Sequence, residues 1–153
     1  MTAPNPIGPI LALDLGQKRV GAAISDQLLI SIKRLAPIKR SNWKSLLQIV
    51  RGLIEEFDAG TLVIGLPLRL DGTEGDAALE VHSTAVKFAK SLAVPVYLQD
   101  ERLTSVAAEE KLREEGYGSR EIAELVDSEA AAIILRDFLA SGPEDRSPLT
   151  TTP

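Results

Sequence analysis

The sequence predicts an α/β domain with a five-stranded mixed sheet and helices on both faces. Three observations favour this fold class. Two short apolar segments, 10–15 and 20–25, flank a turn-like segment, as paired antiparallel strands do. Residues 43–57 carry apolar side chains at helical spacing. From residue 61 onward, short apolar segments alternate with helical ones, which is typical of parallel strands joined by helices.

Three antiparallel strands open the predicted fold. The first two, 10–15 and 20–25, are joined by the tight connection 16–19. The third, 28–38, is rich in Leu and Ile but is interrupted by basic residues and by Pro37, which favours a more exposed strand. We expect these strands to form a curled meander.

An amphipathic helix follows, over residues 43–57. Ser41 or Asn42 is available as its N-cap, and Gly60 is its C-terminal stop. The next segment, 61–66, is apolar almost throughout, as expected for a strand that is covered on both faces.

Helices are then predicted over 76–92, over 105–115 with Thr104 as its cap, and within 119–140. A fifth strand is predicted over 94–99. The resulting order, βββαβαβαα, adds two parallel strands to the meander and places helices on both faces of the sheet.

Length and composition indicate one globular domain. The chain has 153 residues, of which 44% are hydrophobic and 25% charged. We expect the domain to span residues 10–140, between a flexible segment at 1–9 and a disordered, Pro- and Thr-rich tail at 141–153. No apolar segment approaches the roughly 18 residues that a membrane span needs. Residues 1–9 lack the pattern of a secretory signal, so the expected location is the cytoplasm.

The absence of cysteine and the single histidine, His82, restrict the possible chemistry. Disulfides, thiolate zinc sites, cysteine nucleophiles and multi-histidine metal sites are all excluded within one chain. Any metal would have carboxylate ligands, which favour Mg²⁺ or Mn²⁺. His82 itself falls on a predicted helix and is interpreted as a surface or partly buried residue.

Charge is distributed unevenly along the chain. The net charge is −5, yet residues 1–51 contain eight Lys and Arg against two Asp, a net charge of +6. The rest of the chain carries −11. A basic face on an acidic protein is therefore possible, although solvated basic residues that happen to fall early in the chain explain the pattern equally well.

Four acidic residues are candidates for chemistry. Asp14 interrupts an apolar strand, where a carboxylate is costly unless it is paired, binds a cation or bonds the following turn. Asp100 and Glu101 directly follow a strand. They are either functional groups at the end of that strand or simply part of a charged loop. Asp127 precedes a small-residue segment and is a candidate helix cap. If acids from these three places converged, they would repel one another unless divalent cations lay between them.

Four segments, 11–26, 62–75, 98–112 and 126–139, resemble the YqgF/RuvX family. The resemblance covers about residues 10–140, with all four motifs in the right order. It implies an RNase H-like fold, similar to Holliday-junction resolvases, and a cytoplasmic hydrolase: a nuclease acting in maturation of the 5′ end of 16S rRNA.

The resemblance also implies a ligand set for one or two Mg²⁺ or Mn²⁺ ions. Asp14 matches the acid of the family's first strand, and Asp127 matches the acid that opens its last helix. Glu101 corresponds best to the remaining acid, with Asp100 as the alternative. Because successive strand residues point to opposite faces, only one of Asp100 and Glu101 is expected to face the metal.

Three basic residues, Lys18, Arg19 and Arg102, are candidates for binding substrate phosphates. Arg102 has the alternative of an ion pair with a neighbouring acid. The loop 67–75 either folds over the substrate or uses its glycines only for turning. Trp43 sits at a helical core position, which favours packing over base stacking.

The predicted function is metal-assisted hydrolysis of phosphodiester bonds in nucleic acid, either pre-16S rRNA or branched DNA. The first alternative is a Holliday junction resolvase that cuts four-way DNA as a two-fold dimer. The second is a non-catalytic RNA-binding assembly factor. A ribosomal particle is a possible further partner, and the expected state is a monomer or a homodimer.

Overall fold

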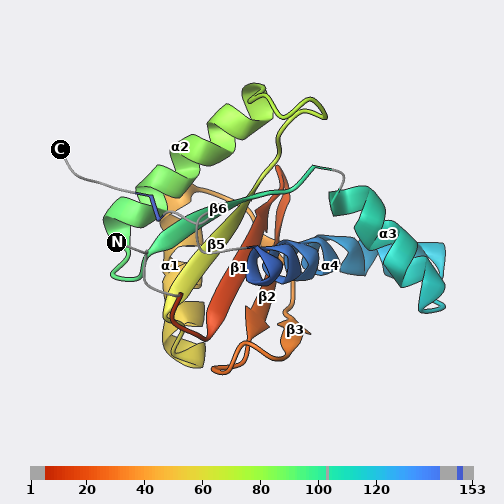
Figure 1. Ribbon diagram of the computed structural model, residues 1–153, viewed down its shortest axis with the longest axis horizontal. Coiled ribbons are helices and arrows are strands. Elements are labelled where there is room, and N and C mark those ends of the chain that lie inside the picture. Colours follow the sequence, from red (N-terminus) through yellow and green to blue (C-terminus); the bar gives the residue numbers. More distant parts are fainter. Residues whose placement is uncertain (1–5, 103, 142–147, 150–153) are drawn as a thin grey trace.

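One mixed sheet organises the chain, with helices packed against both of its faces (Figure 1). The computed structural model describes residues 6–102, 104–141 and 148–149. Its sheet order is β3-β2-β1-β5-β6, and β4 also pairs with β2. The strands are β1 (Ile10–Leu15), β2 (Arg19–Ser25), β3 (Ile32–Arg34), β4 (Ile38–Lys39), β5 (Thr61–Leu66) and β6 (Val96–Asp100).

The pairing combines a meander with two parallel strands, as predicted. β2 runs antiparallel to β1, β3 and β4. β5 runs parallel to β1, and β6 runs parallel to β5. The carboxyl ends of β1, β5 and β6 therefore meet at one edge of the sheet, where functional groups gather in α/β proteins.

The predicted count of five strands is wrong by one in the described part of the chain. The segment predicted as one strand over 28–38 contains two short strands, β3 and β4, which pair with successive parts of β2. Pro37 has no N–H to donate and lies directly before β4, which explains the break. Residues 26–31 form a turn in which Asp26 Oδ1 accepts hydrogen bonds from the N–H groups of Ile30 and Ser31.

Four helices are described, close to their predicted positions. Asn42, and not Ser41, caps the first one, because its side chain accepts a hydrogen bond of 2.8 Å from the N–H of Ser45. Thr104, predicted to precede the third helix as its cap, lies inside it. The helices are α1 (Trp43–Phe57), α2 (Asp76–Ser91), α3 (Thr104–Glu114) and α4 (Ser119–Ala140).

Each face of the sheet has its own hydrophobic core. On one face, Leu46 and Val50 of α1 and Phe88 of α2 pack against apolar residues of β1, β2, β5 and β6. On the other, Ile134 and Phe138 of α4 pack against β1, β5 and β6. α3 packs against α4 and projects away from the sheet with it (Figure 1). Helices on both faces were predicted, and this is confirmed.

Residues just outside the predicted domain boundaries also contact the sheet. The carbonyl oxygen of Ile7 accepts a 2.7 Å hydrogen bond from Thr61 Oγ1, and Leu149 N–H donates to Val96 O at 2.7 Å. The rest of the segments predicted to be flexible, 1–5 and most of 141–153, lies outside the described residues. Among the described residues, no helix is long and apolar enough to cross a membrane.

A buried carboxylate joins α4 to β3 and α3. The side chain of Glu129 is 2% exposed and lies 3.0 Å from Arg34 Nη1 and 2.8 Å from Lys111 Nζ. Arg136 Nη1 is 3.8 Å from the same carboxylate. Neutralising a buried carboxylate that has cationic partners lowers the stability of the fold, because the positive charges of the partners are then left uncompensated.

We therefore expect Glu129→Gln to lower the free energy of unfolding by about 3 kcal/mol, measured by urea denaturation. Glu124→Gln is the control, because Glu124 is exposed on the same helix. Equal stability of the two variants would show that the buried ion pairs do not hold α4 in place.

Candidate active site

Asp14 lies on the face of the sheet that α4 covers. Residues two apart along a strand point to the same face, and Ile10 and Ala12 of β1 pack against α4. Asp14 continues this row near the carboxyl end of the strand, where it pairs with Gly21 of β2. The apolar run of β1 therefore ends in a half-buried carboxylate that faces α4.

Glu101 reaches the same face from β6. Tyr97 of β6 packs against α4, and Glu101 stands four residues further along, so strand alternation gives it the same side. The N–H of Glu101 donates a 3.0 Å hydrogen bond to Leu66 O at the end of β5. A Cβ on Gly65 would lie 2.8 Å from the Glu101 carboxyl carbon and 2.4 Å from Ile134 Cδ1. Any larger residue at this position would force the side chains of Ile134 and Glu101 to move.

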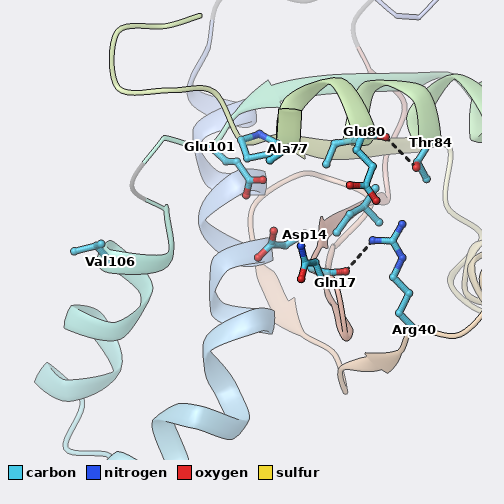
Figure 2. A pocket seen from close by; sticks show the side chains of 12 residues that line it. Asp14, Gln17, Arg40, Ala77, Glu80, Thr84, Glu101 and Val106 are labelled. Carbon is cyan, nitrogen blue, oxygen red and sulfur yellow. Dashed lines mark hydrogen bonds between the residues drawn. The ribbon is translucent and has the colours of Figure 1, made fainter. Parts of the chain in front are cut away.

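The carboxylates of Asp14 and Glu101 point toward each other (Figure 2), and each affects the pKa of the other. Two carboxylates that face each other repel unless one of them is protonated. Burial, followed by the nearby charge of Asp14, raises the pKa of Glu101 to about 9. Burial also raises the pKa of Asp14. Near neutral pH, the protein without a metal therefore holds one proton between these two acids.

Asp127 stands behind this pair, in the middle of α4. It does not cap or open the helix, as the sequence and the resemblance suggested, because α4 begins eight residues earlier at Ser119. Its negative charge contributes to the raised pKa of Asp14. Its Oδ2 atom is buried without a hydrogen-bond partner and lies 3.1 Å from Arg19 Nε in an ion pair.

Gly21 explains how Asp127 comes so close to the sheet. A Cβ at this position would lie only 1.9 Å from the carbonyl oxygen of Asp127. The backbone of α4 therefore rests directly on β2 at the strand residue that pairs with Asp14. Ser128 fixes the same part of the helix, since its hydroxyl donates a 2.6 Å hydrogen bond to Leu35 O.

Asp100 and Arg102 form an ion pair with each other and take no part in the contact between Asp14 and Glu101. Two nitrogens of the Arg102 guanidinium lie 2.9 and 2.7 Å from Asp100 Oδ2, and its Nη1 donates to Leu70 O at 3.1 Å. The Arg102 side chain, followed by its charge, holds the pKa of Asp100 below its usual value despite some burial. The ion pair foreseen as an alternative for Arg102 is thus present, and it connects the end of β6 to the loop 67–75.

The two other predicted basic residues differ in their contacts. Arg19 of β2 pairs with Asp127 and donates a 3.4 Å hydrogen bond to Ala123 O, so it ties the strand to α4. Lys18 is exposed in the turn between β1 and β2 and forms no ion pair within the described residues.

A cavity of about 310 Å³ opens beside the acid pair. Asp14 and Glu101 form one side of it, and Glu80 of α2 and Arg40 form the other (Figure 2). The Arg40 guanidinium donates a 2.8 Å hydrogen bond to Gly16 O, which holds the turn after β1 in place. The cavity gives the acid pair access to a ligand from the side of α2.

In the described part of the chain, no three acidic or histidine side chains are gathered closely enough to form a ready metal site. The structure pairs Asp14 with Glu101 and turns Asp127 toward Arg19. Trp43 packs edge-on against Phe88, with ring centroids 4.7 Å apart, so it belongs to the core as predicted.

Comparison with known proteins decides the family. A family model described as "RuvX: Holliday junction resolvase" matches residues 8–141. The chain belongs to the RuvX family.

Relatives of this RuvX-family chain carry a consistent name. A protein from Anaeromyxobacter sp. (strain Fw109-5), named "Putative pre-16S rRNA nuclease", is 40% identical over 129 residues, which cover 84% of this chain and 94% of the relative. A protein of the same name from Gloeothece citriformis (strain PCC 7424) is 42% identical over 129 residues, covering 84% and 85%. The predicted family and the predicted class of enzyme, a nuclease, are confirmed.

The fold is shared with a solved resolvase. The structure titled "T. thermophilus RuvC in complex with Holliday junction substrate" matches with a TM-score of 0.58 at 15% identity, covering 93% of this chain and 100% of that one. At this identity the match supports the RNase H-like fold alone, which is the predicted fold class.

Two glycines of the site, Gly21 and Gly65, were not among the residues that the sequence patterns singled out. Gly21 and Gly65 each stand inside a strand, where a glycine weakens the strand and marks a close approach by another group. That signal was available in both apolar segments. It could not show which group would approach, because Asp127 and Glu101 come from distant parts of the chain.

The shared proton makes the stability of the metal-free protein depend on pH. In the unfolded chain Glu101 releases its proton near its ordinary pKa of 4.5, whereas the folded protein keeps it up to about pH 9. The folded state therefore binds more protons across this range, and stability falls as the pH rises. We expect Glu101→Gln, which imitates the protonated acid, to be more stable than wild type by about 1–3 kcal/mol at pH 8 in EDTA, with little difference near pH 4.5.

Urea denaturation at a series of pH values tests this expectation. Glu80→Gln is the matched control, because Glu80 lines the same cavity from the exposed surface of α2. A Glu101→Gln protein with the same pH dependence as wild type would contradict the shared proton.

Gly65→Ala tests the space for Glu101. The added methyl collides with Ile134 and Glu101, so we expect a loss of about 1–3 kcal/mol in stability and about 100-fold in nuclease rate. Gly52→Ala in α1 is the control, since its Cβ would meet nothing within 4 Å and alanine favours the helix. Unchanged activity in Gly65→Ala would show that the exact position of Glu101 is unimportant.

Proposed function

We propose that this chain is a divalent-metal-dependent nuclease that hydrolyses phosphodiester bonds of pre-16S rRNA during maturation of its 5′ end. The family and the names of its relatives support the nuclease class, and the relatives' names also support this substrate. The observation that carries the metal dependence is the contact between the half-buried carboxylates of Asp14 and Glu101 at the carboxyl ends of β1 and β6.

The donor atoms fit a hard divalent cation. Asp14, Glu101 and Asp127 offer only carboxylate oxygens, which Mg²⁺ and Mn²⁺ prefer. Two of these acids must share a proton when no cation is between them, and the buried Oδ2 of the third forms an ion pair with Arg19 but accepts no hydrogen bond. We infer that the three residues hold one or two such ions, with Asp100 excluded from the set by its bonds to Arg102.

A bound ion in such a site lowers the pKa of water and neutralises charge on the phosphate that is cut. The protein's own groups prepare for this. Glu101 must give up its proton, after which it and Asp14 present two negative charges at the cavity. Arg19 holds Asp127 in place from β2, and Arg102 holds the loop 67–75 beside the site through Leu70 O.

The partner in this proposal is nucleic acid, bound through basic residues that lie near the site in the N-terminal part of an otherwise acidic chain. Lys18 is available for a phosphate, whereas Arg19 and Arg102 act mainly by positioning other groups. Binding through such cations weakens as salt increases. We further propose that the protein works in the cytoplasm, as a monomer or homodimer, on RNA within a ribosomal particle.

A second candidate is cleavage of four-way DNA, which the description of the family model favours. A resolvase has to cut two strands symmetrically and so acts as a two-fold dimer. A third candidate, an RNA-binding assembly factor without catalysis, would use the same fold but would not need the acid pair.

We expect wild-type protein with Mn²⁺ or Mg²⁺ to cut a labelled 5′ segment of pre-16S rRNA, and EDTA to abolish cutting. Asp14→Asn should lower the rate by at least about 1,000-fold, because it removes a charge that the metal requires. Asp58→Asn is the matched control: Asp58 is exposed, with left-handed backbone at the end of α1, which asparagine also adopts.

A synthetic four-way DNA junction is tested in parallel. Paired nicks in the junction, with the RNA left intact, would favour the resolvase. If neither substrate is cut while both are bound, the assembly factor is favoured. Cutting that is equally fast in Asp14→Asn would contradict the proposed site.

A further inference from the structure

A second cavity, of about 550 Å³, lies at the β4 side of the sheet and is bordered by cations. Lys18, Arg19, Pro37 and Lys39 line it. Lys39 lies outside the four segments that resemble the family, and it does not line the cavity beside the acid pair. Its position relative to Arg19 and Asp127 shows what this cavity can bind.

The strand register brings two positive charges together. Arg19 of β2 and Lys39 of β4 are direct partners in an antiparallel pair. Residues paired in this way have neighbouring side chains on the same face, and two like charges there destabilise the sheet. The next pair, Val20 with Ile38, is buried and belongs to the opposite face. The fold thus keeps an unfavourable pair of cations next to a well-packed one.

Both cations lie on the face that carries the acids. Gly21 and Ala23 alternate with Val20 along β2 and contact α4, so Arg19 is on the α4 face as well. Direct pairing then gives Lys39 the same face. The cavity therefore lies on the Asp127 side of the acid pair, away from the first cavity and α2.

The cations differ in whether they are already neutralised. Arg19 lies 3.1 Å from Asp127 and also bonds Ala123 O. Within the described residues, neither Lys18 nor Lys39 forms an ion pair. Two ammonium groups, those of Lys18 and Lys39, thus border one cavity without a carboxylate partner among the described residues. The third cation of the cavity, Arg19, is already paired with Asp127.

The backbone holds the two lysines in a fixed relation. The N–H of Arg40, the residue after Lys39, donates a 3.0 Å hydrogen bond to Lys18 O. The Arg40 side chain bonds Gly16 O at 2.8 Å in the same turn. A Cβ on Gly16 would lie 2.5 Å from Arg19 O, so this tight turn depends on glycine. Such preorganisation lowers the cost of binding an anion between the two lysines.

We propose that Lys18 and Lys39 form a seat for a backbone phosphate of the nucleic-acid substrate, separate from the phosphate that is cut. The seat lies on the Asp127 side of the acids and guides the strand across the sheet from β4. Because lysine acts as a point charge and not as a planar fork, the seat reads no base sequence. The substrate rests on the proposed function, whereas the anion seat itself does not.

The test measures binding without cleavage. The probe is a single-stranded RNA from the 5′ segment of pre-16S rRNA with hydroxyl groups at both ends, so that only internal phosphates are present. Its dissociation constant is measured in EDTA over a range of salt concentrations. We expect Lys39→Thr and Lys18→Ala each to weaken binding several-fold, equally for RNAs of unrelated sequence, and to reduce the slope of log K against log salt by about one.

Lys33→Thr is the matched control. Lys33 is an exposed lysine of β3 that pairs with Ile24, a residue of the core on the opposite face. It should keep the wild-type affinity and salt slope. If Lys33→Thr weakens binding as much as Lys39→Thr does, only the total charge matters and the seat is overturned.

Thermal stability supplies a second readout that a purely structural lysine would not produce. Lys39→Thr removes the like-charge pair with Arg19, so its melting temperature should rise by about one to three degrees while its affinity falls. If the melting temperature and the affinity both fell, Lys39 would be a residue that stabilises the fold, and the proposed phosphate seat would be contradicted.

The outcome also separates this proposal from the proposed function. If Lys39→Thr binds RNA as wild type does while Asp14→Asn still abolishes cutting, the seat is wrong and the nuclease stands. If wild-type protein binds neither RNA nor DNA even at low salt, the proposed function fails together with the seat.

Discussion

The contact between the Asp14 and Glu101 carboxylates is the constraint on which the rest of the site depends. Two acids in a partly buried place cannot both be ionised unless a positive charge lies between them. When no cation is bound, burial and the charge of Asp14 raise the pKa of Glu101 to about 9, so the two acids keep one proton near neutral pH. A divalent cation would replace that proton. The repulsion between the two acids, which costs the folded protein stability, therefore also favours the binding of a cation, a common relation between stability and function.

Two glycines make this arrangement possible. Gly65 leaves room for Glu101 over β5, and Gly21 lets the backbone of α4 touch β2 at Asp127. Two neighbouring residues then hold α4 in this position. Ser128 bonds Leu35, between β3 and β4, and the buried Glu129 pairs with Arg34 of β3 and Lys111 of α3. Several stabilising contacts of α4 thus lie within two residues of Asp127, so the packing of the helix and the placement of the acid cannot be separated.

The arginines and the lysines around the site have different roles, which follow from the chemistry of their side chains. The guanidinium groups of Arg19, Arg40 and Arg102 each bond a carboxylate or a carbonyl oxygen of another element, which suits their fixed, multiple donors. Lys18 and Lys39, in contrast, form no ion pair within the described residues. The arginines therefore hold the elements of the site together, and these two lysines remain available for a charged partner.

The sequence by itself determined the fold class, most element positions and the acids worth considering. These follow from local rules: helical spacing in 43–57, alternation in the strands, and the cost of placing Asp14 in an apolar segment. Strand alternation also predicted that only one of Asp100 and Glu101 would face the other acids, and the bonds of both residues agree. The break of 28–38 into two strands was harder to predict, because the pairing of each piece with β2 depends on distant residues.

Only the tertiary structure decided which groups meet. Glu101 and Asp14 are far apart in the chain, and the parallel pairing of β1, β5 and β6 brings them together. Asp127 resembles a cap in sequence but lies mid-helix, since α4 begins well before the small-residue segment. The pairing of Lys39 with Arg19 depends on the register of two strands that a turn and β3 separate. Register and helix docking are properties of long-range packing, which is why local sequence patterns do not contain them.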